Sequence, residues 1–222
     1  MGTAPRNTEK EKKMRSINLS DITMSMPART GGYDLSFREK IEVAKLLDRV
    51  GIQVIETAAI KDKRTDSLLI KSIASAVKSG TVAVPLILTE KDTVKTTWNA
   101  LKEAKKPRLQ VVAPVSTVQM EYISRMKPAA IVKKIAKLTE EAKAVCSDVE
   151  FVAWDAGRSE ADFLKEAINA AVEAGATEVT LCDTAGNLLP SMTGTPRGVW
   201  SSLRHSPHPE SLPGSSGPSC RS

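Results

Sequence analysis

Four acidic side chains stand at the ends of short apolar runs, and they are the residues best placed to do chemistry. They are Asp21, Glu56, Asp155 and Asp183. If the apolar runs are parallel strands, their carboxyl ends meet at one face of the fold, where the active sites of such folds gather. Carboxylates clustered there would bind a hard cation or transfer a proton. The alternative is that each carboxylate caps a helix or accepts hydrogen bonds from loop amides.

Two further polar residues accompany these acids, whereas histidine is absent from the same region. Arg158 follows the third acid by three residues, and Thr184 follows the fourth directly. The two histidines, His205 and His208, both lie after residue 190, so no imidazole in residues 1–190 could act as a base or metal ligand. Three candidate nucleophiles therefore lack a histidine partner: Ser25, Ser116 and Cys182.

Strands and helices must position these residues, and six short apolar runs are predicted as buried strands. They are Ile17–Ile22, Gln53–Glu56, Ala83–Leu88, Leu109–Val115, Val149–Ala153 and Glu178–Cys182. Helical patterns lie between most of the runs. In the first, Ser36 and Glu39 form a capping box and Gly51 ends the helix. Three more helices are predicted to begin at Thr89, at Lys127-Pro128, and at Ser159 with Asp162.

Alternating strands and helices predict an α/β fold with parallel strands and right-handed crossovers. The residues alone leave two architectures open, a doubly wound sheet and a (β/α)8 barrel. No G-x-G-x-x-G follows a strand, which weakens the dinucleotide-binding alternative. A complete barrel needs eight strands and about 250 residues. Only six strands are visible before the pattern stops near Pro190, so a barrel would be incomplete.

Charge and composition divide the chain into three regions. Residues 1–15 form a basic arm and residues 191–222 form a Ser/Pro/Gly-rich tail, and both are predicted to be disordered. These ends carry most of the net charge of +6, and aromatic residues make up 4% of the chain, so nucleic-acid binding is not expected. No apolar run reaches the about 18 residues of a membrane span, and the N-terminus lacks a secretory signal. Three cysteines without a CxxC pair fit a cytoplasmic protein.

Four segments of residues 16–191 resemble one enzyme superfamily in order and spacing. LSDITMSMPARTGG resembles D-T-T-L-R-D-G-E-Q-T-P-G, and APVSTVQMEYISRM resembles T-S-P-I-H-M-E-Y-K-L-R-M. VEFVAWDAGRSEADFL resembles V-E-F-S-A-E-D-A-T-R-T-D-x-x-F-L, and AGATEVTLCDTAGNLLPS resembles A-G-A-T-x-I-x-x-x-D-T-V-G-x-x-x-P. These patterns are typical of the 2-isopropylmalate synthase, homocitrate synthase and HMG-CoA lyase superfamily. The M-E-Y-x-x-R-M stretch is most similar to the 2-isopropylmalate synthases.

The resemblance implies a TIM-type barrel, here incomplete with about six βα units. It also implies a divalent metal, Mg²⁺ or Mn²⁺, and a Claisen condensation of acetyl-CoA with a small 2-oxoacid in leucine biosynthesis. A homodimer or hetero-oligomer is expected as well. Six positions keep the polar residues of the family and are predicted to bind substrate: Asp21, Glu56, Asp155, Arg158, Asp183 and Thr184. Among these, Thr184 matches a threonine that contacts the 2-oxoacid in the synthases.

This sequence differs from the family pattern at the positions of the catalytic residues and the metal ligands. Ser25 and Met26 replace the arginine that stabilises the carbonyl oxygen and the aspartate that ligates the metal. Gln110 and Gln119 replace the histidines of the fourth strand, and Trp154 replaces the glutamate of the fifth. No catalytic residue and no metal ligand is therefore predicted to be retained, so the acyltransferase would be impaired or inactive.

Two other functions stay open. The chain could be a non-catalytic barrel, a pseudoenzyme that binds a metabolite or a partner through its carboxylate-lined mouth. It could instead be a lyase or aldolase that acts on a small oxoacid with the surviving acids. No lysine stands at an obvious strand end for a Schiff base, since Lys61 lies just past the second predicted strand.

Overall fold

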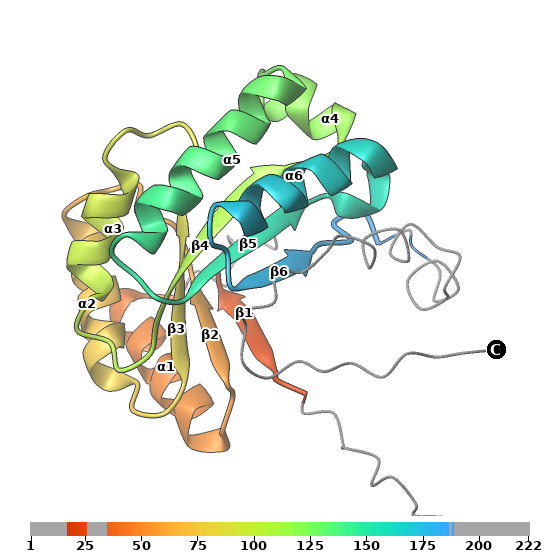
Figure 1. Cartoon of the computed structure of the whole chain (residues 1–222). Coiled ribbons are helices and arrows are strands. Elements are labelled where there is room, and N and C mark those ends of the chain that lie inside the picture. Colours follow the sequence, from red (N-terminus) through yellow and green to blue (C-terminus); the bar gives the residue numbers. More distant parts are fainter. Residues whose placement is uncertain (1–16, 26–34, 187, 189–222) are drawn as a thin grey trace, which may run out of the picture.

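The computed structural model describes residues 17–25, 35–186 and 188 (Figure 1). Within them, one sheet of six strands runs in the order of the sequence, and every neighbouring pair is parallel. The strands are β1 (Ser20–Met24), β2 (Val54–Thr57), β3 (Thr81–Leu86), β4 (Pro107–Pro114), β5 (Val149–Trp154) and β6 (Glu178–Leu181). A doubly wound sheet would reverse its strand order at a switch point. The sequential order therefore excludes that alternative.

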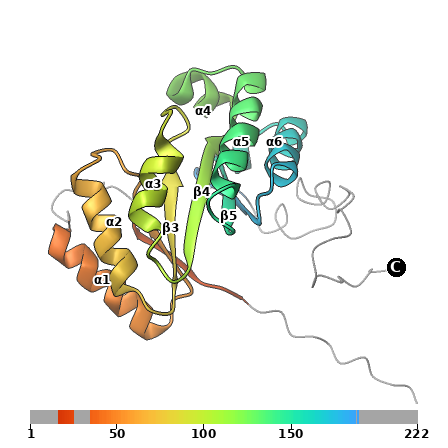
Figure 2. The ribbon, with the colours of Figure 1, turned by 60° about the vertical axis from the view of Figure 1, so that its left-hand side comes forward.

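Helices connect the strands and lie along the outer side of the curled sheet, as the two views show (Figures 1 and 2). The longer ones are α1 (Phe37–Val50), α2 (Thr65–Ala76), α3 (Thr93–Leu101), α5 (Pro128–Lys143) and α6 (Ala161–Glu173). Three short turns complete the described elements: α4 (Thr117–Gln119), the π-helix η1 (Met120–Ser124) and the 3₁₀ turn η2 (Ala156–Arg158). The arrangement confirms the predicted incomplete TIM-type barrel.

The hydrophobic core fills the space between the sheet and the helices. Leu109, Val111 and Phe151 are fully buried there against helix residues such as Ile135 and Leu164. Because side chains alternate along a strand, the residues between these positions face the inside of the curl. Gln110 and Glu150 are such residues, so the inner face of the sheet is partly polar.

Burial falls sharply at the last strand. On β5, Phe151 and Ala153 are fully buried. Their neighbours in register on β6, Val179 and Leu181, are only partly buried. In the described residues β6 therefore has a strand on one side and incomplete cover from helices, as expected for one edge of a sheet.

The first and third predicted helices are confirmed, but two predicted helix starts are wrong. Ser36 Oγ accepts from the N–H of Glu39 and closes the predicted capping box, and Gly51 ends α1 in the left-handed region at φ 84°. The predicted cap at Thr89 is not formed, because α3 begins at Thr93. The predicted cap at Ser159 is not formed either, because its hydroxyl donates to the carbonyl of Val115 instead.

The sequence patterns missed helix α2. Arg64, the N-cap residue of this helix, makes no side-chain capping hydrogen bond, so no capping pattern in the sequence marks the start of the helix. The carboxylate of Asp62 accepts from the N–H groups of Arg64 and Thr65 instead, at 2.8 Å each. An aspartate three residues before the first helical residue was the available signal.

Several predictions concern residues that the structure does not describe. They are the predictions of disorder for residues 1–15 and 191–222, the latter with both histidines, and the prediction for Met26. Among the described residues, no helix is both long and apolar enough to cross a membrane.

Candidate functional site

Asp155 is the best-defined polar residue at the carboxyl ends of the strands. It follows β5 directly, and its side chain is fully buried. Its backbone is left-handed, with φ 65° and ψ 38°. Aspartate adopts this region more readily than most residues, but the conformation still costs free energy and needs support from its surroundings.

Two side chains hold the Asp155 carboxylate. Ser116, just after β4, donates from Oγ to Oδ2 at 2.5 Å. Arg158 donates from Nη2 to Oδ2 at 2.6 Å and from Nε to both carboxylate oxygens at 3.0 Å. Burial raises the pKa of Asp155, but the hydrogen bonds from Arg158 and Ser116 outweigh it, and the pKa lies below its ordinary value. Asp155 is therefore an ionised, fully partnered carboxylate.

The backbone around Asp155 ties β5 to the end of β6. The Asp155 N–H donates to Thr184 Oγ1 at 3.1 Å, and the Ala156 N–H donates to the Cys182 carbonyl at 2.9 Å. The next residue, Gly157, packs so closely on Asp183 that an added Cβ would lie 2.9 Å from Asp183 Oδ1. The ends of β4, β5 and β6 are therefore joined at Asp155, through its carboxylate to Ser116 and through its backbone to the segment after β6.

The structure thus connects Asp155, Arg158 and Thr184 directly and places Asp183 beside them. The carboxylate of Asp183 also accepts from the N–H of Leu188 at 3.0 Å. The remaining two predicted site residues have other partners.

Those two residues, Asp21 and Glu56, lie on β1 and β2. Asp21 accepts from the N–H and hydroxyl of Thr23 at 3.0 and 3.1 Å, which is the loop-amide alternative considered for it. Glu56 accepts from Ser20 Oγ at 2.6 Å. Neither has a hydrogen bond to the Asp155 cluster.

Sequence reasoning missed a polar network on the inner face of the sheet. Glu150 is almost completely buried and accepts from Gln110 Nε2 at 3.0 Å and from Thr180 Oγ1 at 2.5 Å. Arg108 lies 3.6 Å from the same carboxylate. Burial raises the pKa of Cys182, and the charges of the Glu56 and Glu150 carboxylates raise it further. The available signal was the alternation of polar residues along neighbouring strands, since Gln110 and Glu150 are register partners.

No metal site is evident in the part of the chain that the structure describes. No three His, Cys, Asp or Glu side chains of this part of the chain come together as a ligand group. Ser25 donates from Oγ to the carbonyl of Ile22 within its own turn, at 2.9 Å. A neutral hydroxyl there cannot replace the positive charge of an arginine.

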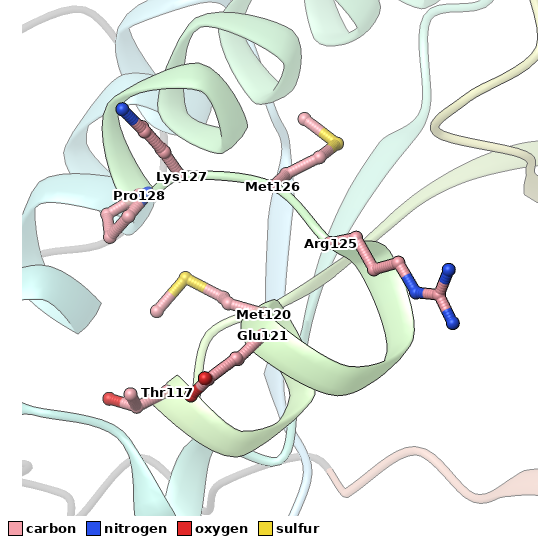
Figure 3. A pocket seen from close by; sticks show the side chains of 7 residues that line it. All are labelled: Thr117, Met120, Glu121, Arg125, Met126, Lys127 and Pro128. Carbon is pink, nitrogen blue, oxygen red and sulfur yellow. The ribbon is translucent and has the colours of Figure 1, made fainter.

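A separate surface depression of about 430 Å³ lies beside β4, on α4, η1 and the start of α5. Its lining residues are Thr117, Met120, Glu121, Arg125, Met126, Lys127 and Pro128 (Figure 3). In Figure 3 the Arg125 guanidinium points away from Thr117 and Glu121. None of the six predicted site residues lines this depression.

The Asp155 cluster presents two hydrogen-bond donors at the strand ends. The Arg158 side chain is 37% exposed, and its Nη1 group makes no hydrogen bond within the described residues. Thr184 is exposed, and its hydroxyl can donate because Asp155 uses only its oxygen as an acceptor. Such a pair can bind an anionic or carbonyl oxygen.

Comparison with known proteins finds one family and relatives that share one name. Residues 17–196 match the HMGL-like family. The 2-isopropylmalate synthase of Halalkalibacterium halodurans is 34% identical over 177 residues, 80% of this chain and 34% of that protein. The 2-isopropylmalate synthase of Campylobacter hominis is 36% identical over 175 residues, 79% of this chain and 34% of that protein. The chain thus spans about a third of the length of these relatives.

Similarity to solved structures is weaker. Phosphonopyruvate hydrolase in complex with oxalate and Mg²⁺ has a TM-score of 0.48 and 17% sequence identity. The likeness covers 75% of this chain and 61% of the hydrolase.

Proposed function

This chain belongs to the HMGL-like family, and we propose that it is a 2-isopropylmalate synthase-like barrel that binds a small 2-oxoacid at its strand ends. The observation that carries the proposal is the arrangement of Asp155, Arg158 and Thr184. It attaches a guanidinium and a hydroxyl donor to one residue, Asp155, whose buried carboxylate is the counter-charge. A 2-oxoacid offers a carboxylate and a keto oxygen, which are the acceptors that such donors recognise.

We expect little or no Claisen condensation of acetyl-CoA by this chain. A base must remove a methyl proton of acetyl-CoA to form its enolate. When the enolate adds to the keto carbon of the 2-oxoacid, the keto oxygen becomes an alkoxide, which needs a positive charge beside it. Ser25 stands where the family pattern has arginine, and its hydroxyl is bonded within its own turn. The described residues offer no ligand group for a divalent metal. The proposal therefore concerns binding, in the setting of cytoplasmic leucine biosynthesis.

Thermal unfolding tests the proposed binding. The chain is melted alone, with 3-methyl-2-oxobutanoate, with Mg²⁺, and with both. A ligand that binds only the folded state stabilises it by about 2.7 kcal/mol at 100 times its Kd, so the melting temperature should rise with 2-oxoacid concentration. Thr184→Val should remove the rise, and Thr81→Val, at the opposite end of the sheet, should keep it. An unchanged melting temperature at high 2-oxoacid concentration contradicts the proposal.

Condensation is measured separately, by chromatographic detection of CoA after incubation with acetyl-CoA, the 2-oxoacid and Mg²⁺. The expected result is no CoA above a protein-free control. Release of CoA that requires both the 2-oxoacid and the metal would show that the chain is an active acyltransferase.

The partly buried apolar residues of β6 favour a second candidate function, partner binding. Val179 and Leu181 lack the complete cover of their β5 neighbours, and unpaired sheet edges promote association. A homodimer or a complex with an intact synthase would cover them. Size-exclusion chromatography with light scattering checks this candidate, and a lone monomer at every concentration would oppose it.

A further inference from the structure

The left-handed conformation of Asp155 directs two successive N–H groups toward β6. In an extended strand, neighbouring N–H groups point to opposite sides, so only one of them could reach the adjacent strand. Here the Asp155 N–H reaches Thr184 Oγ1 at 3.1 Å and the Ala156 N–H reaches the Cys182 carbonyl at 2.9 Å. The turn at Asp155 therefore fixes two points on the segment that carries Thr184.

The Asp155 side chain holds this turn in place. A left-handed residue other than glycine is strained, and such a conformation persists when its surroundings over-determine it. Here the carboxylate is fully buried and accepts from Ser116 and Arg158. Rotation of the backbone at Asp155 would break both interactions.

The hydrogen bond from the Asp155 N–H also orients the Thr184 hydroxyl. A hydroxyl has one hydrogen to donate and two lone pairs to accept with. One lone pair accepts from the Asp155 N–H, so the O–H hydrogen points elsewhere, and Thr184 lies exposed at the strand ends. We infer that Asp155 is a positioning residue, which acts through its own N–H to aim the Thr184 hydroxyl at a ligand oxygen.

This inference rests on the proposed function for the identity of the ligand, a 2-oxoacid. The orientation of Thr184 can nevertheless be measured without any ligand. A purely stabilising Asp155 would affect the free energy of unfolding but would leave the Thr184 side chain and the ligand affinity of folded molecules unchanged.

The first measurement is the Thr184 rotamer. Three-bond carbon couplings of ¹³C-labelled threonine methyl groups report χ1, and the Thr184→Val spectrum assigns the signal. We expect one rotamer in the unaltered chain, averaged rotamers in Asp155→Ala, and one rotamer again in Asp155→Asn. Asparagine tolerates the left-handed region and its side-chain oxygen can still accept from Ser116.

A milder variant covers the case in which Asp155→Ala does not fold. Ser116→Ala removes one of the two groups that hold the carboxylate, and it should produce partial averaging at Thr184. An averaged Thr184 in the unaltered chain overturns the inference. So does a single rotamer that persists in Asp155→Ala or, where that variant is unfolded, in Ser116→Ala.

The second measurement is calorimetric titration with 3-methyl-2-oxobutanoate. A hydrogen bond to a charged group contributes about 1.5–3 kcal/mol, so Asp155→Ala should weaken binding by about tenfold or more. Thr184→Val should weaken it equally, the double variant should lose nothing further, and Asp155→Asn should restore it. If the unaltered chain does not bind while the rotamer results hold, the proposed function fails and the positioning of Thr184 stands.

Discussion

Replacement of Ser116 by alanine tests whether the Asp155 cluster stabilises the fold as its geometry indicates. Ser116 is fully buried and donates to the Asp155 carboxylate at 2.5 Å. A hydrogen bond to a charged group contributes about 1.5–3 kcal/mol. The contact from the Gln119 N–H to Ser116 Oγ, at 3.3 Å, is long and adds little. Ser116→Ala should therefore lower the free energy of unfolding by about 2–3 kcal/mol at pH 7.

The loss should depend on pH because the acceptor is an ionised carboxylate. The pKa of Asp155 lies below its ordinary value, since the bonds from Arg158 and Ser116 outweigh the effect of burial. A group with a lowered pKa in the folded state contributes stability that is present above its unfolded pKa, about 3.9, and is lost as the pH falls through the folded pKa. The difference between Ser116→Ala and the unaltered chain should stay constant from neutral pH to about 5 and shrink below about 4.

Urea unfolding at a series of pH values measures this difference, with Ser159→Ala as the matched control. Ser159 Oγ donates at 2.7 Å to the carbonyl of Val115, an acceptor that does not titrate. Removing this hydrogen bond should lower the free energy of unfolding by about 0.5–1.5 kcal/mol. That decrease should be the same at every pH of the series. A cost below about 0.5 kcal/mol for Ser116→Ala would refute the reasoning, as would a cost that rises as the pH falls below about 4.

Three further predictions concern stability, each measured by urea unfolding. Phe151→Ala should lower the free energy of unfolding by about 3–5 kcal/mol, because the ring is fully buried in the core. A loss of only about 1 kcal/mol would mean that neighbouring side chains move in to fill the cavity. Asp48→Ala should cost about 2–3 kcal/mol, because its carboxylate accepts from the N–H groups of residues 78, 79 and 80 and from the Ser79 hydroxyl, and Asp48→Asn should cost less. Gly157→Ala should cost about 1–3 kcal/mol, because its Cβ would lie 2.9 Å from Asp183 Oδ1; an unchanged stability would show that the loop after β6 moves without cost.

Strand positions were the most predictable feature of the fold. All six apolar runs became strands of one parallel sheet, although the predicted limits differ by several residues at Ile17–Ile22. Strands that pack against covering helices are rich in apolar residues, and that enrichment is visible in the sequence. Helix starts were harder to predict, because Ser159 has the right type for a cap but donates to another strand end instead.

The candidate site shows where sequence reasoning stops. The sequence placed Asp155, Arg158 and Thr184 at strand ends, and the structure connects these three. Asp21 and Glu56 have the same type and the same position in their segments, but they bond to neighbours on their own edge of the sheet. Nothing in the residue types distinguishes the two groups, because the distinction depends on which way each side chain points.

The sequence by itself determined the alternating strands and helices and the family, and it predicted that Ser25-Met26 replaces the Arg-Asp pair. These depend on local patterns of residues, which one chain displays without folding. Only the tertiary structure decided that Ser116 and Asp155, 39 positions apart, share a hydrogen bond, and that the left-handed turn at Asp155 contacts Thr184. Such contacts follow from the register and curl of the sheet, which the whole core sets together, and no single segment specifies them.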